Sequence, residues 1–218
     1  MWGRWVMALG GLLVVLITPA FALSYFGAYG DEYQAPHDWL AALQDPLVSG
    51  GALDPGSTAQ YDGYGLLYLG AWVIGLVGLV GVVGSQWVRF TERLRRAWSA
   101  VIATLALVTV GVFGDYALPD EVLGFIGFVL TGVGFLAAAV MFLLLGRALR
   151  RELGTRRRAA WTVGALGIVS VFGGMALVGH IPSGPGLGFA VAALVAGLAR
   201  PWQVGPERWD SLSIDPVD

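Results

Sequence analysis

The segment "YGLLYLGAWVIGLVGLVGVVGSQWV" (residues 64–88) decides the fold, because it contains no charged residue over its whole length. An α-helix rises about 1.5 Å per residue, so about 20 apolar residues cross the hydrocarbon core of a bilayer. No water is available at that depth to satisfy free backbone groups, and a helix satisfies them internally. The segment is therefore predicted to be a membrane-spanning helix.

Similar apolar segments recur along the chain. Of its 218 residues, 56% are hydrophobic and 13% are charged, with a mean hydropathy of +0.71, whereas a soluble domain carries about 25% charged residues. We predict an all-α polytopic membrane protein that forms a single integral membrane domain over residues 1–218. Its six predicted spans are 5–27, 64–88, 98–117, 121–146, 160–179 and 186–199, with an outer loop at 28–63 and a cytoplasmic tail at 200–218.

The first span has a competing interpretation. Arg4, the apolar residues after it and the sequence Ala20-Phe21-Ala22 form the pattern of a cleaved signal peptide. The apolar run continues beyond this pattern to Tyr25 and Phe26, which favours a retained span.

The charges predict the orientation of the spans. All thirteen basic residues are arginines, and every one lies on the same side of the six-span arrangement, together with six acids. Cytoplasmic loops carry an excess of basic residues, so both termini are predicted to be cytoplasmic, in a multi-pass protein of the plasma membrane. The acidic outer side and the absence of lysine also suit a halophilic origin. The outer acids are Asp31, Glu32, Asp38, Asp45, Asp54, Asp62, Asp115, Asp120 and Glu121.

Two missing residue types limit the chemistry. Without cysteine there is no disulfide, thiolate metal site or cysteine nucleophile, and without lysine there is no retinal Schiff base. No ionisable residue is predicted at mid-depth of a span, which disfavours a carrier that uses a buried carboxylate. No cofactor is predicted. The expected partners are the lipid bilayer and, left open, a second copy or a partner membrane subunit; no nucleic acid is expected.

Glycines predict how the helices pack. Small residues let helix backbones approach closely in a bilayer, and packing within the chain is favoured over a dimer face. The predicted packing glycines, spaced three residues apart within their groups, are Gly75, Gly78, Gly81, Gly84, Gly111, Gly114, Gly124, Gly127, Gly164 and Gly167. Residues 95–118 and 157–177 share an Arg-Arg-Ala start and a Val-Phe-Gly sequence near their ends, which leaves open a duplicated hairpin.

The outer loop is predicted to contain a short interfacial helix. Trp39, Leu40, Leu43 and Leu47 follow Pro36 at a spacing that gives a helix one apolar face. Aromatic residues near the predicted span ends are interpreted as interfacial anchors. Those at the outer ends are Tyr25, Tyr29, Tyr61, Tyr64 and Tyr68.

The sequence "GHIPSGPG" (179–186) is predicted to be the outer turn between the last two spans. His180 in this turn, with His37 and Asp115 on the same side, defines the candidate site for a metal, a haem or acid–base chemistry. No metal-binding spacing such as H-x-x-x-H occurs, so capping of a helix end by His180 is the favoured interpretation. Ser183 shares one short turn with His180, unlike the serine and histidine of rhomboid proteases, which disfavours intramembrane proteolysis.

The layout of a first span, a long outer loop and further spans joined by basic inner loops resembles prokaryotic six-span membrane proteins related to the Frag1/DRAM group. The resemblance is architectural, extends over most of the chain and implies no functional residue. We favour a non-enzymatic membrane subunit or scaffold packed through Gly-rich helices. The alternatives are a small-solute or cation permeation protein with an acidic outer mouth, and an outer-face metal, haem or acid–base site around His180.

Overall fold

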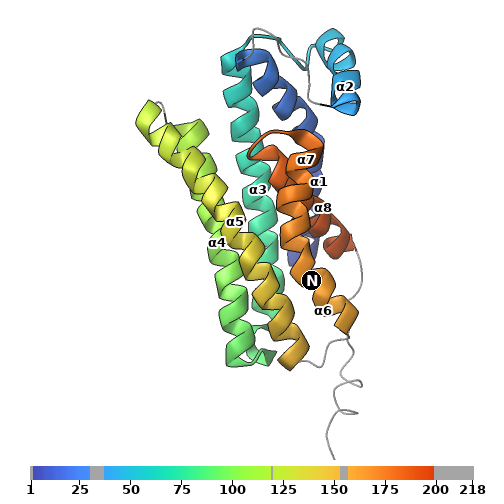
Figure 1. The fold of residues 1–218 in the computed structure, drawn as a ribbon, viewed down its shortest axis with the longest axis vertical. Coiled ribbons are helices and arrows are strands. Elements are labelled where there is room, and N and C mark those ends of the chain that lie inside the picture. The colour runs from blue at the N-terminus through green and yellow to red at the C-terminus, as the bar shows by residue number, and fades with distance from the viewer. Residues whose placement is uncertain (1, 30–36, 119, 153–156, 199–218) are drawn as a thin grey trace, which may run out of the picture.

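The computed structural model describes residues 2–29, 37–118, 120–152 and 157–198. Most of these residues lie in helices, as predicted (Figure 1). Five helices are long and apolar enough to cross a membrane, and α8 is a shorter apolar helix. Pro36 and the predicted tail 200–218 lie outside the described residues. The elements are α1 (Trp2–Tyr29), α2 (Asp38–Ser49), α3 (Thr58–Gln86), η1 (Trp87–Arg89), α4 (Glu92–Ala117), α5 (Glu121–Glu152), α6 (Arg157–Ile168), η2 (Val169–Gly173), α7 (Gly174–Val178) and α8 (Ser183–Leu198).

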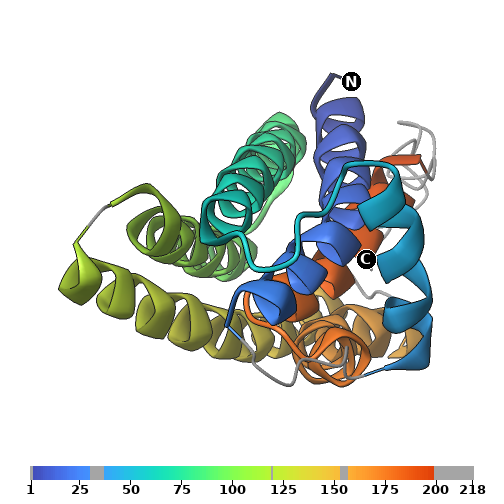
Figure 2. The ribbon, with the colours of Figure 1, turned by 90° about the horizontal axis from the view of Figure 1, so that it is seen from above.

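The long helices form two groups. Helix α1 packs between α3 and α8, and α4 packs along α5, which continues the bundle to α6. Figure 1 shows α5 crossing the molecule diagonally, so that the C-terminal end of α4 and the N-terminal end of α5 lean away from α7. Seen from above in Figure 2, the C-terminal end of α4 and the N-terminal end of α5 project to one side of the bundle. The two segments of similar sequence differ in structure. Residues 157–177 contain the π-helical turn η2, whereas 95–118 is α-helical through Ala117.

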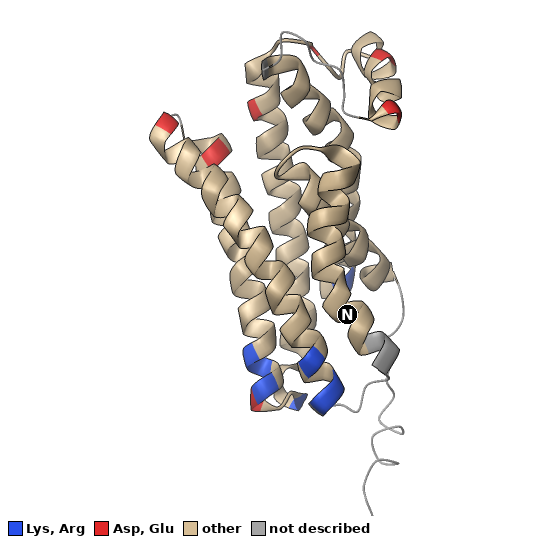
Figure 3. Cartoon of the chain, in the orientation of Figure 1, with Lys and Arg blue, Asp and Glu red and all other residues tan. Residues whose placement is uncertain are grey.

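Charged residues gather at opposite ends of the bundle. In Figure 3 the arginines of α4 and α5 lie at one end of the molecule, and the acids of α2, α3 and the α4–α5 connection lie at the other. Glu92 is an acid at the arginine-bearing end, where it forms an ion pair with Arg96. We refer to the end with α2 as the outer end and to the other as the inner end.

Glycines bring helix backbones into direct contact. A Cβ atom added to Gly78 would overlap the backbone of Met7, and one added to Gly10 would overlap that of Gly75. Between α4 and α5, a Cβ at Gly111 would lie 2.5 Å from the backbone nitrogen of Thr131. The contacts do not involve every predicted glycine, because a Cβ at Gly84 would meet nothing within 4 Å.

Similar close approaches occur at glycines that the three-residue spacing did not identify. They allow α5 to approach α6, α7 to approach α8, and α8 to approach both η2 and α1. These glycines include Gly146, Gly174, Gly184, Gly188 and Gly197.

Helix α2 packs against the outer ends of α1 and α7. Leu40 is fully buried in a cluster with Phe26 and Val178, and the Trp39 indole N–H donates to the Leu177 carbonyl over 2.9 Å. The predicted apolar face is therefore divided, because Leu40 contacts the bundle whereas Leu43 on the same helix is exposed. This contact holds α2 beside the turn that contains His180.

We predict that Gly78→Ala destabilises the protein by about 1–3 kcal/mol, because the added methyl group must push α1 and α3 apart. Gly84→Ala is the matched control: its methyl group meets open space, and alanine is the better helix former. Thermal unfolding in detergent measures both. Equal effects of the two substitutions would contradict close packing at Gly78.

Candidate functional site

The turn between α7 and α8 places His180 inside the protein. Gly179 ends α7 in the left-handed conformation with φ of 72°, and its N–H donates to the Met175 carbonyl. The backbone then folds tightly, since the Gly184 N–H donates to the His180 carbonyl over 2.7 Å. His180 is consequently only 3% exposed, although it lies between two apolar helices in the sequence.

Both ring nitrogens of His180 form hydrogen bonds with hydroxyl groups. Nδ1 lies 2.7 Å from the Ser183 hydroxyl, and Nε2 lies 3.3 Å from the Tyr61 hydroxyl. The Tyr61 hydroxyl in turn lies 2.6 Å from that of Tyr116. A neutral imidazole donates a hydrogen bond from one nitrogen and accepts one at the other, so the two hydroxyl groups satisfy both nitrogens.

The chain of hydrogen bonds reaches Asp115 at the outer end of α4. The Asp115 carboxyl interacts with the Tyr116 hydroxyl, and Asp62 of α3 is near enough for the two carboxylates to interact. Asp115 is half-buried and Asp62 is exposed, whereas Ser183 is fully buried. A polar chain therefore runs from the outer surface into the protein and joins α4, α3 and the α7–α8 turn. We call Asp115, Tyr116, Tyr61, His180 and Ser183 the His180 chain.

Glycines make room for two buried tyrosines, Tyr116 of the His180 chain and Tyr68 beside it. The Tyr116 ring occupies the space that a Cβ of Gly65 would fill, which lets its hydroxyl reach Tyr61. The Tyr68 hydroxyl takes the corresponding space at Gly186 and donates to the Pro182 carbonyl over 3.1 Å. The absence of a side chain at Gly65 and Gly186 thus lets α4 and the α7–α8 turn form hydrogen bonds with tyrosines of α3.

Aromatic rings seal the imidazole from water. The ring centroid of Tyr25 lies 4.5 Å from that of His180, and the ring of Phe21 meets it edge-on at 5.0 Å. Burial lowers the pKa of His180, which lies in the turn between α7 and α8, to about 3. The side chain is therefore neutral at physiological pH.

The structure brings together two of the three predicted site residues. His180 and Asp115 are linked through Tyr61 and Tyr116, whereas His37 precedes α2 as its N-cap residue and makes no side-chain capping bond. Within the described ranges, no group of three His, Cys, Asp or Glu residues could hold a metal ion. Because both nitrogens of His180 form hydrogen bonds with hydroxyl groups, the arrangement suits proton sharing among these groups better than metal or haem ligation.

The sequence interpretation missed Tyr61, Tyr68 and Tyr116 as members of the site. Tyr61 and Tyr68 were expected to be interfacial anchors, but they are 8% and 0% exposed. Their spacing with Gly65 and Trp72 places all four residues on one stripe of α3, and this periodicity is the signal that could have identified them.

Comparisons with protein-family models, curated proteins and solved structures find no match for this chain. The site must therefore be interpreted from its own geometry.

We predict that the Tyr61→Phe and Ser183→Ala substitutions are energetically coupled by at least about 0.5 kcal/mol, because both hydrogen bonds end on the same imidazole. A double-mutant cycle on unfolding in detergent measures this coupling. The control cycle combines Tyr61→Phe with Ser85→Ala, which removes a hydroxyl bonded to the Val82 carbonyl near the other end of α3. Additive effects in both cycles would show that the His180 chain does not act as a unit.

Proposed function

We propose that this chain is a non-enzymatic subunit or scaffold of the plasma membrane, with six spans, cytoplasmic termini and α2 in the outer interface. The observation that carries the proposal is the burial of His180 and Ser183, the two members of the His180 chain that lie furthest from the outer surface. Ser183 is fully buried and His180 is 3% exposed, so no open route leads a substrate to these two side chains. A connection that holds helices together needs no such route.

The connected pattern of the His180 chain supports a structural role. A buried polar group without a partner costs roughly 1–3 kcal/mol, and the cost is higher where no water can enter. Here each hydroxyl and ring nitrogen meets another member of the chain. Breaking the contact between α3 and the α7–α8 turn would therefore leave several groups unsatisfied at once, which fixes one arrangement of the helices.

Charge and length support the proposed topology. The arginines of α4 and α5 lie at one end of the bundle, which the positive-inside rule places in the cytoplasm. Helix α8 has 16 residues and a length of about 24 Å, and a bilayer thins locally around a short span. The exposed side chains of Trp39 and Leu43 suit a helix that lies in the outer interface.

A cation or proton permeation protein is the second candidate. Asp115 and Asp62 lie at the outer end of the His180 chain, where they would attract a cation. A complete path would require the chain to continue below Ser183. Among the buried threonines of the described residues, Thr18 and Thr131 donate to carbonyls of their own helices and not to a member of the His180 chain, so the structural role is favoured.

A reporter fused after Asp218 tests the topology. We expect it to be active on the cytoplasmic side, because six spans return the chain to the side on which it began. Activity outside the cell would contradict the six-span arrangement.

Purification from native membranes in mild detergent tests the function. We expect a partner subunit or a second copy at a fixed stoichiometry, retained after Asp115→Asn, because this change leaves the buried bonds among Tyr61, His180 and Ser183 in place. An isolated chain whose liposomes show cation flux that is lost in Asp115→Asn but kept in His180→Ala would contradict the scaffold and favour permeation.

A further inference from the structure

One face of α5 is apolar along most of its length and ends in arginines. Val133, Leu136, Val140 and Leu144 are each 43–52% exposed. Steps of three and four residues keep these side chains on one face of a helix, at about 100° per residue. Continuing the same steps leads to Arg147 and Arg151, which are exposed at the inner end. We call these six residues the α5 stripe.

The α5 stripe faces away from the neighbouring helices. The buried residues Phe135, Ala138 and Phe142 lie on other faces of α5. Close approaches at Gly146 and at Gly167 of α6 define the side of α5 that packs against α6. The stripe is thus the part of α5 that would meet lipid in a membrane.

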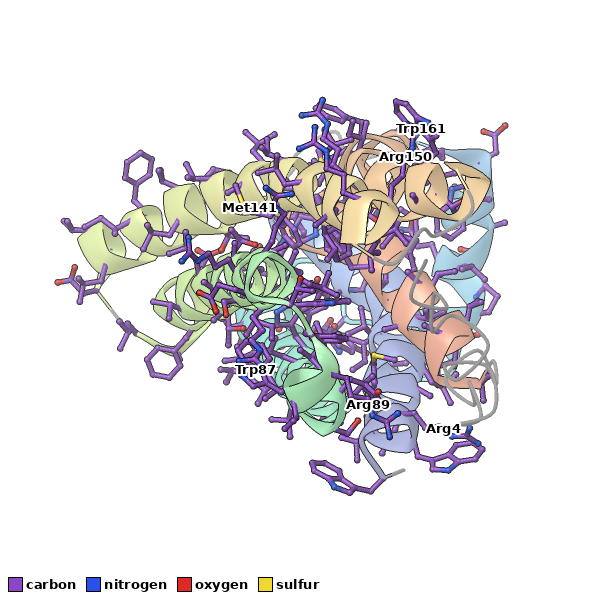
Figure 4. The ribbon with its side chains drawn as sticks, turned by 90° about the horizontal axis from the view of Figure 1, so that it is seen from below. Arg4, Trp87, Arg89, Met141, Arg150 and Trp161 are labelled. Carbon is purple, nitrogen blue, oxygen red and sulfur yellow. The ribbon has the colours of Figure 1, made fainter. Side chains whose placement is uncertain are left out.

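Arg150 and Trp161 lie near the arginine end of the stripe. Arg150 is exposed beside Arg151, and Trp161 of α6 is 59% exposed. Figure 4, which views the inner end from below, shows Arg150 and Trp161 on the same side of the molecule. A close contact between Gly146 and Ala160 holds α6 beside α5 at this level. Tryptophan rings favour the depth of lipid headgroups, so they mark where a phosphate would lie.

We propose that the α5 stripe binds an anionic phospholipid. The acyl chains would lie along the four apolar residues, and the phosphodiester would meet Arg147 and Arg151, whose guanidinium groups suit phosphate oxygens. A zwitterionic lipid offers the same acyl chains but also carries a cation that the arginines would repel. Charge complementarity therefore selects the anionic class.

The inner end of α4 provides an internal comparison. Arg96 is also exposed there, but it is paired with Glu92 over 2.9 Å. The exposed positions that follow along its helix face are Ser99 and Ala103, which offer little apolar contact to an acyl chain. Arg89 lies exposed in the neighbouring turn η1. These two arginines supply equal charge without an apolar stripe.

Native mass spectrometry of the detergent-solubilised full chain with added phosphatidylglycerol or phosphatidylcholine tests the proposal. The wild type should retain phosphatidylglycerol preferentially. The Arg147→Gln and Arg151→Gln double variant should bind it about 25-fold more weakly, since each charge near a lipid surface contributes about fivefold. The Arg89→Gln and Arg96→Gln double variant should bind it nearly as tightly as the wild type.

Two further measurements test whether charge and acyl chains are both required. Changing Arg147 and Arg151 to lysine should preserve most of the binding, which shows that the glutamine variant has lost charge and not its fold. Glycerol 3-phosphate should bind far more weakly than the lipid, because it lacks acyl chains. Equal losses in the two glutamine variants, or equal retention of both lipids by the wild type, would overturn the proposal.

Discussion

The imidazole of His180 is the group on which the outer half of this protein depends. It is removed from water, so both its nitrogens must find partners inside the protein. Ser183 supplies one partner from the start of α8, and Tyr61 supplies the other from α3. Through Tyr116 the same set of bonds extends to α4. One side chain therefore determines how three separate parts of the chain lie relative to one another.

Hydrogen bonds of this kind require helices to approach closely, and glycine makes the approach feasible. The hydrophobic effect does not drive apolar helices together in a bilayer, because lipid is as apolar as leucine. Contacts such as Gly10 with Gly75 hold α1 against α3 through direct backbone packing. Gly65 and Gly186 play a different part, since their missing side chains leave space for tyrosine rings. The fold thus uses glycine both to join helices and to make room for buried tyrosines.

The helical fold class and five helices long enough to cross a membrane could be predicted from the sequence, because long apolar segments leave a strong signal in their length and composition. The candidate site could be predicted only in part. His180 and Asp115 are conspicuous in apolar surroundings, but their connection through Tyr61 and Tyr116 depends on contacts between distant helices. Tyrosine suits both interfacial anchoring and buried hydrogen bonding, and the residue type does not distinguish them. His37 lies on the same side in the sequence, yet its place before α2 keeps it out of the His180 chain.

The most direct test of the central claim is ¹⁵N NMR of the two histidines, followed from pH 8 to pH 5 in detergent and assigned with a His37→Gln variant. If His180 is sealed and bonded at both nitrogens, its signals should remain those of a neutral imidazole with one protonated and one unprotonated nitrogen throughout this range. An imidazole that titrates near pH 6.5, as a solvent-exposed histidine does, would contradict the account.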